Sequence, residues 1–181
     1  MARILNLRHS AKINPVIYIV DDNELDLKVL AQEFELRTNY DVKGYKSGES
    51  FLKDLISNLP QKGQMVIVIL DYELNTMNID AKNGVELLKT IKEINREYEV
   101  ILISKTSDPD MITSALHFGA VNIVKKNENV YLRLQNNIKW ILSQRELKKK
   151  RIEMLKSIAF FILLLMITTL FAFFASEVFQ L

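Results

Sequence analysis

The stretch that decides the fold is MVIVILD, Met65 to Asp71, in which six apolar residues are followed at once by a carboxylate. Four of the six are β-branched, which is typical of a strand buried on both faces of a parallel sheet. Two similar runs lie on either side of it in the sequence, Val16 to Val20 (VIYIV) and Val100 to Ser104 (VILIS). These three runs predict the centre of a parallel sheet.

Two weaker runs, Asp41 to Tyr45 (DVKGY) and Val121 to Val124 (VNIV), bring the number of expected strands to five. Segments with apolar residues at helical spacing follow all five. This alternation predicts an α/β fold, a doubly wound five-stranded parallel sheet with right-handed crossovers. For the first helix, the predicted buried positions are Leu25, Val29, Leu30 and Phe34.

Polar residues stand where four of the expected strands end. In a doubly wound sheet the binding site lies at the carboxyl ends of the strands. The residues at those ends are Asp21-Asp22, Asp71, Ser104-Lys105 and Lys125-Lys126.

The residue types at these ends indicate a metal and phosphate site. Three carboxylates in a partly desolvated cleft would repel one another, and Mg²⁺, which takes oxygen ligands, relieves that repulsion. A lysine and a hydroxyl supply a positive charge and a hydrogen-bond donor for a phosphoryl group. Each group alone is ordinary, since an aspartate after a strand most often caps a turn or helix, but together they predict a site.

These residues give the chain a close resemblance to the receiver domain of two-component response regulators, a flavodoxin-like fold. The resemblance covers about residues 14 to 145. It rests on the acidic pair after VIYIV, Asp71 after VIVIL, Ser104 after VILI and Lys126 seven residues after Gly119. The segment NGVELLKTIKE (83–93) and the pair Gly119-Ala120 also resemble family segments.

The resemblance implies that Asp71 is the phosphoacceptor, which takes a phosphoryl group from a phosphohistidine of a histidine kinase or phosphotransfer protein. It implies Mg²⁺ as cofactor. Asp22 and Asp71 would bind the metal, Asp21 largely through water, and the backbone carbonyl of Glu73 would be a further ligand.

On the opposite side of the site, the resemblance implies that Ser104 and Lys126 contact phosphoryl oxygens. The spacing favours Lys126 over Lys125. Ile123 occupies the switch position, where the family commonly has an aromatic residue. Phosphorylation would draw Ser104 toward the phosphate and shift the loop behind it.

Three further departures leave a second interpretation open. Lys105 stands where a small residue is usual, Asn127 replaces the usual proline, and the loop over residues 72–84 is longer than usual. The alternative is therefore a receiver fold that takes no phosphate and serves as a constitutive docking platform at the membrane.

A second feature is the uncharged stretch Ser157 to Ser176 (SIAFFILLLMITTLFAFFAS). As a helix, its twenty residues would span about 30 Å, the thickness of a bilayer's hydrocarbon core. Only Thr168 and Thr169 interrupt its apolar middle, so it lacks the polar face of a soluble helix. The sequence predicts that the last receiver helix extends into a single transmembrane helix; the alternative is a buried core helix.

The flank before this stretch, Lys139 to Lys156, has seven basic and two acidic residues and a net charge of +5. Since basic flanks stay cytoplasmic, we expect a single-pass, tail-anchored protein of the cytoplasmic (inner) membrane with its receiver domain in the cytoplasm. Residues 1–15 lack the apolar run of a signal peptide. The absence of cysteine agrees with a reducing compartment.

The expected organisation is an N-terminal arm (1–13), receiver domain (14–145), basic juxtamembrane helix (146–156), transmembrane helix (157–176) and short tail (177–181). Expected partners are a kinase or phosphotransfer protein, the lipid bilayer, an unknown membrane-associated effector and, by family resemblance, a second copy in a homodimer. Nucleic acid is not expected, because the basic stretch abuts the membrane. An enzyme is not expected either, since no nucleophile–base pair or zinc motif is present.

Overall fold

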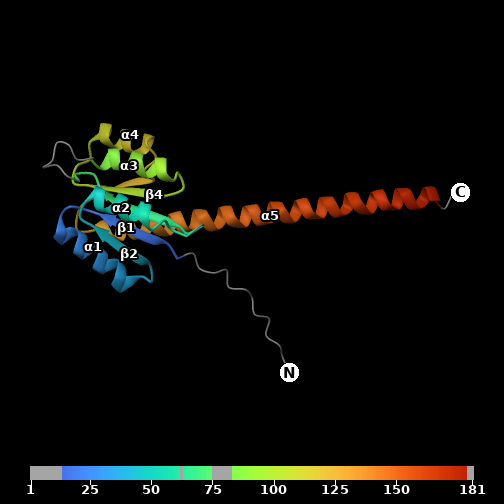
Figure 1. Ribbon diagram of the computed structural model, residues 1–181, viewed down its shortest axis with the longest axis horizontal. Coiled ribbons are helices and arrows are strands. Elements are labelled where there is room, and N and C mark those ends of the chain that lie inside the picture. Colours follow the sequence, from blue (N-terminus) through green and yellow to red (C-terminus); the bar gives the residue numbers. More distant parts are fainter. Residues whose placement is uncertain (1–13, 62, 75–82, 179–181) are drawn as a thin grey trace, which may run out of the picture. The chain divides into compact units, whose positions relative to one another are not determined.

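A computed structural model describes residues 14–61, 63–74 and 83–178; side chains are described as far as residue 170. The chain divides into two compact units, Met1–Ile138 and Lys139–Leu181. The first contains the α/β domain and the second the distal part of the last helix (Figure 1). The predicted arm (1–13) and most of the long loop after Asp71 lie outside the described residues.

One five-stranded parallel sheet forms the centre of the first unit, in the order β2-β1-β3-β4-β5. This is the flavodoxin-like doubly wound order, so the prediction is confirmed. The three most apolar runs become the central strands, and all but one of their residues are buried beneath the helices that cover the sheet. The strands are β1 (Val16–Val20), β2 (Asp41–Tyr45), β3 (Val66–Asp71), β4 (Glu99–Ser104) and β5 (Asn122–Lys125).

Side chains that alternate along β1 enter two different cores. Tyr18 packs against Phe51 with ring centroids 5.4 Å apart, in a cluster that also contains Leu87 and Ala115. Ile19, its neighbour in the strand, is fully buried on the other face. The two cores hold the sheet between helices.

Four helices follow the first four strands: α1 (Glu24–Arg37), α2 (Gly48–Ser57), α3 (Gly84–Ile94) and α4 (Pro109–His117). Each begins at a side chain that accepts hydrogen bonds from the first turn, as expected of Asn, Ser and Asp caps. Asn83 is the clearest case, since its carboxamide caps α3 while Glu86 reaches back to the Asn83 N–H. The caps of the other three helices are Asn23, Ser47 and Asp108.

The predicted buried face of α1 is wrong in part. Leu30 and Phe34 are buried as expected, but Leu25 is 69% and Val29 53% exposed. Leu27 takes their place, so that the buried stripe follows the spacing i, i+3, i+7. This rotation of the helix leaves two apolar side chains on its open side.

Gly84 docks α3 directly onto the backbone at the end of β3. A Cβ atom at this position would lie 2.6 Å from the Asp71 carbonyl oxygen and 2.7 Å from the Tyr72 Cα. Both are backbone atoms, so neither can turn aside. Only glycine allows this close approach.

The last helix, α5 (Val130–Val178), is 49 residues long. Its first part belongs to the α/β unit, where Leu134 and Ile138 are fully buried. Over Val130–Leu170 it is long and apolar enough to cross a membrane, with a mean hydropathy of 1.9 in its most apolar window, none of which is buried. The expected extension of the last receiver helix into an apolar segment is therefore present.

Candidate functional site

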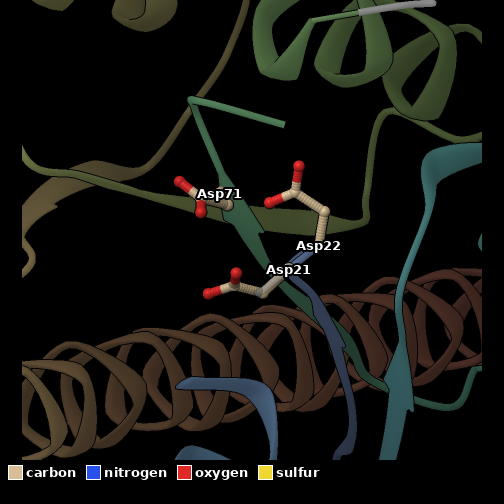
Figure 2. Close-up of side chains that lie close together, drawn as sticks. All are labelled: Asp21, Asp22 and Asp71. Carbon is tan, nitrogen blue, oxygen red and sulfur yellow. The ribbon is translucent and has the colours of Figure 1, made fainter. Parts of the chain in front are cut away.

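Three carboxylates lie together where β1 and β3 end (Figure 2). The strand register pairs Val20 of β1 with Leu70 of β3. The next residues, Asp21 and Asp71, therefore lie side by side at the ends of these neighbouring strands. Asp21 and Asp71 are buried, and Asp22 is exposed. One oxygen from each group lies within 4.8 Å of the other two. Parallel strands bring these side chains to the same edge of the sheet, as the sequence predicted.

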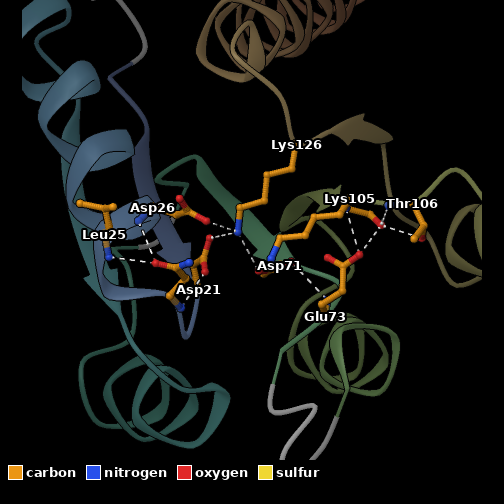
Figure 3. Close-up of polar contacts among 10 residues, drawn as sticks. Asp21, Leu25, Asp26, Asp71, Glu73, Lys105, Thr106 and Lys126 are labelled. Atoms are coloured by element: carbon orange, nitrogen blue, oxygen red, sulfur yellow. Dashed lines mark hydrogen bonds and ion pairs between the residues drawn. The ribbon is translucent and has the colours of Figure 1, made fainter.

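Lys126 joins this cluster from the residue after β5. Its Nζ lies 2.8 Å from Asp21 Oδ2 and 3.0 Å from Asp71 Oδ2, and a third carboxylate, Asp26, lies at 2.9 Å. Figure 3 shows the lysine reaching between the two sides of the site. Lys125, in contrast, is exposed at the end of β5. The structure thus brings Lys126 to the carboxylates, while Asp26 is a contact that sequence reasoning missed.

The crowding of charges shifts their protonation. Burial, the charge of Asp21 and hydrogen bonding with the Glu73 carboxyl group raise the pKa of Asp71 to about 7. Burial opposes the charge of Lys126, but its hydrogen bonds to Asp21, Asp26 and Asp71 outweigh burial and raise the lysine pKa. The carboxylates therefore favour additional positive charge beside them.

The donor set fits a hard divalent cation. Mg²⁺ binds oxygen at 2.0–2.1 Å, so two ligands on one ion are separated by about 4.2 Å at most. The carboxylate oxygens of Asp21, Asp22 and Asp71 need little adjustment to meet this limit. The backbone carbonyl of Glu73 stays a predicted ligand.

Ser104 faces the site from the end of β4 and is fully buried. Its Oγ donates a hydrogen bond to Glu73 Oε1 at 2.8 Å, and the Lys105 N–H donates to the same oxygen at 3.0 Å (Figure 3). The Thr106 N–H in turn donates to Ser104 Oγ at 3.1 Å. A carboxylate thus occupies the donors beside the predicted phosphoacceptor.

The Glu73 side chain is the contact that sequence reasoning missed most clearly. Its second oxygen, Oε2, is buried and receives no hydrogen bond from a nitrogen or hydroxyl of the described residues. Burial opposes the charge of Glu73, but hydrogen bonds with Asp71, Ser104 and the Lys105 backbone lower its pKa. The available signal was an acidic residue two positions after Asp71.

The remaining site positions lie around this centre. Ile123 is half-buried in β5 and packs at the margin of the core, opposite Leu102 in the strand register. In Figure 3 the Lys105 side chain extends toward Asp71. Asn127, which follows Lys126, accepts a hydrogen bond from the Asn129 N–H at 3.1 Å and so shapes the turn into α5.

The predicted membrane anchor lies within α5. Ser157 begins the uncharged stretch, and its other end, Ser176, belongs to the helix without a described side chain. The hydroxyls of Thr168 and Thr169 donate to the Leu165 carbonyl at 2.9 and 3.0 Å. These two polar groups are therefore satisfied inside the helix, as an apolar surrounding requires.

Known proteins resemble the chain over the α/β unit. TodT, a response regulator protein of Pseudomonas putida, is 28% identical over 120 residues, which cover 66% of this chain and 48% of TodT. The chain thus matches about half the length of that relative.

Solved structures of receiver domains also resemble the chain. A CheY-like receiver domain protein of Methanospirillum hungatei has a TM-score of 0.62 at 21% identity, covering 75% of this chain and 98% of that one. The BeF3-activated receiver domain of DrrB, from Thermotoga maritima, has a TM-score of 0.54 at 27% identity and covers 70% and 98%. Residues 17–137, more than half of the chain, match the response regulator receiver domain. The chain belongs to this family.

Proposed function

We propose that this chain is a membrane-anchored response regulator receiver that accepts a phosphoryl group on Asp71. The observation that carries the proposal is the group of side chains around Asp71. Two further carboxylates and the Lys126 ammonium lie beside it, and Ser104 faces the same edge of the sheet. Asp71 is 2% exposed and ends β3, so its carboxylate is held at a fixed place at the edge of the sheet.

In the proposed reaction, an Asp71 oxygen forms a bond to phosphorus while the bond from phosphorus to the donor histidine nitrogen breaks. Lys126 neutralises charge on the phosphoryl oxygens, and Ser104 supplies a hydrogen bond. Mg²⁺, held by Asp21, Asp22, Asp71 and the Glu73 carbonyl, would supply further positive charge when bound. The product is an aspartyl phosphate, and no independent enzymatic activity is assigned.

We further propose that α5 tethers this domain to the cytoplasmic membrane. Its twelve Leu, Ile and Phe residues between Ser157 and Ser176 would favour insertion by roughly 4 to 7 kcal/mol. The basic flank 139–156 would keep the receiver in the cytoplasm. The phosphorylated state would then select a membrane-associated effector.

One observation favours a second candidate function, a constitutive docking platform that takes no phosphate. The Glu73 carboxylate already accepts hydrogen bonds from Ser104 and from the Lys105 backbone. A receiver whose hydrogen-bond donors for the phosphoryl group are permanently occupied would keep one conformation and one set of partners.

Incubation of the full chain in detergent with phosphoramidate and Mg²⁺ tests the proposal. Intact mass should increase by one phosphoryl group in the native protein, and neither in Asp71→Ala nor without Mg²⁺. Binding of beryllofluoride, the ligand of the activated DrrB structure, should show the same dependence. Loss of both signals in a folded native protein would favour the docking platform.

A further inference from the structure

Two donors at the end of β4 converge on one anionic oxygen. The Ser104 hydroxyl and the Lys105 N–H both point at Glu73 Oε1, at 2.8 and 3.0 Å. Donors that converge in this way bind an oxyanion, because each adds a charge-assisted hydrogen bond. In this protein a side chain of the same chain fills the position.

The oxyanion position lies next to Asp71. The Glu73 N–H donates to Asp71 Oδ1 at 3.2 Å, and Ser104 and Lys105 follow the residue that pairs with Asp71 in the sheet, Ile103. A phosphoryl group on Asp71 would therefore bring its oxygens to the donors that the Glu73 carboxylate now uses. Two anions cannot share them without strong repulsion in a partly buried site.

We propose that the Glu73 carboxylate is a built-in competitor of the phosphoryl group, which enters only when this side chain leaves the Ser104 and Lys105 donors. The inference rests on the proposed function of Asp71. It makes Glu73 a residue that sets how readily the receiver is phosphorylated, without itself forming a bond to phosphorus.

The environment of the buried Glu73 Oε2 atom supports the proposal that this side chain can leave the Ser104 and Lys105 donors. No nitrogen or hydroxyl of the described residues donates to this oxygen, so only hydrogen bonding with the Asp71 carboxyl group can offset its lost hydration. Outside the cleft it would regain water. The occupied state thus combines two good hydrogen bonds at Oε1 with an Oε2 that has no nitrogen or hydroxyl donor among the described residues, which makes displacement by a better-matched anion feasible.

The inference is tested by titrating beryllofluoride, a phosphoryl mimic, into the full chain in detergent with Mg²⁺. Glu73→Ala should bind it more tightly by about tenfold or more, the effect of one charge-assisted hydrogen bond that no longer has to be broken. Glu73→Gln, which keeps the size and an acceptor but not the charge, should fall between them. Glu93→Ala removes the same charge from an exposed position of α3 and should bind like the native protein.

A second measurement needs neither metal nor phosphoryl mimic. In the metal-free chain, hydrogen exchange at the Lys105 amide should be slow in the native protein and clearly faster in Glu73→Ala, because the carboxylate that accepts this N–H is gone. The Tyr72 amide, which donates to the Ile103 carbonyl at 2.9 Å, should keep its rate and report that the variant is folded.

The outcomes separate the two proposals. Asp71-dependent binding that is equal in native protein and Glu73→Ala, or weaker in the variant, would overturn the competitor and leave the phosphoacceptor intact. No binding by any folded variant would overturn the function of Asp71 and the competitor with it. Binding by Glu73→Ala but not by the native protein would support the competitor and favour the docking platform as the function of the native chain.

Discussion

Two stretches of this chain are almost equally apolar and have opposite surroundings. The side chains of β3 from Val66 to Leu70 are at most 1% exposed, whereas the large apolar side chains of α5 from Ile158 to Leu170 are 47–64% exposed. The first run lies between two helical layers, and none of the described residues buries the second. Composition alone therefore does not decide burial. An exposed apolar surface of this kind needs a partner or a lipid phase.

The difference between the two stretches is tested most strongly by placing a charged residue in each of them. Ile69→Asp should lower the free energy of unfolding by at least about 4 kcal/mol, because an unpaired carboxylate would lie in a fully buried strand. Urea unfolding followed by near-ultraviolet circular dichroism measures the change. Leu164→Asp, in the exposed stretch, should leave the same transition where it is; a matching loss there would mean that the helix belongs to the folded core.

The converse test concerns the membrane. Leu164→Arg should weaken insertion by about 3 kcal/mol, since leucine favours and arginine opposes the apolar centre of a spanning helix. The fraction of protein that stays with carbonate-washed membranes measures it. Leu116→Arg, at a half-exposed position of α4, is the control and should not change this fraction. Because the native segment favours insertion by roughly 4 to 7 kcal/mol, we expect a partial loss of retention, and a loss of the same size in Leu116→Arg would remove the support for the anchor.

The smallest expected effect is the difference in stability between alanine variants of two leucines in α1. Leu27→Ala should cost about 2 kcal/mol or more, because Leu27 is 6% exposed and its loss leaves a cavity under α1. Leu25→Ala, at 69% exposure, should change stability by less than about 0.5 kcal/mol. Thermal unfolding of the two variants side by side is sufficient, and equal destabilisation would contradict the orientation of α1 described above.

This last pair also shows why the sequence predicted the strands better than the helix faces. A strand buried on both faces is a nearly uninterrupted apolar run; β1 is such a strand and has the predicted bounds, and so does the weaker, partly exposed β2. In α1, leucines and charged residues occur on several sides, so Leu25 and Leu27 were equally good candidates for the core. Only the packing of the helix on the sheet chooses between them.

In the candidate site, too, some contacts were predictable from the sequence and others were not. Asp21, Asp71 and the pair Lys125-Lys126 stand at strand ends, so the strand pattern was enough to predict that the sheet brings them together, and the spacing within the family motifs favoured Lys126. The contact between Glu73 and Ser104 depends on the turn after β3 and on a side-chain rotamer. Neither is encoded in a periodic pattern, so the sequence indicates the backbone of Glu73 and an acidic charge near the site, but not the contact of this side chain with Ser104.

The docking of α3 at Gly84 has a consequence for how the chain can vary. Because any Cβ would press on the backbone of the predicted phosphoacceptor and of the next residue, position 84 has a single acceptable amino acid. Gly63, where an added Cβ meets nothing within 4 Å, is constrained only by its φ of +85° and should admit asparagine. In a library that randomises both positions, survivors with a folded receiver should retain glycine at 84 and diversify at 63.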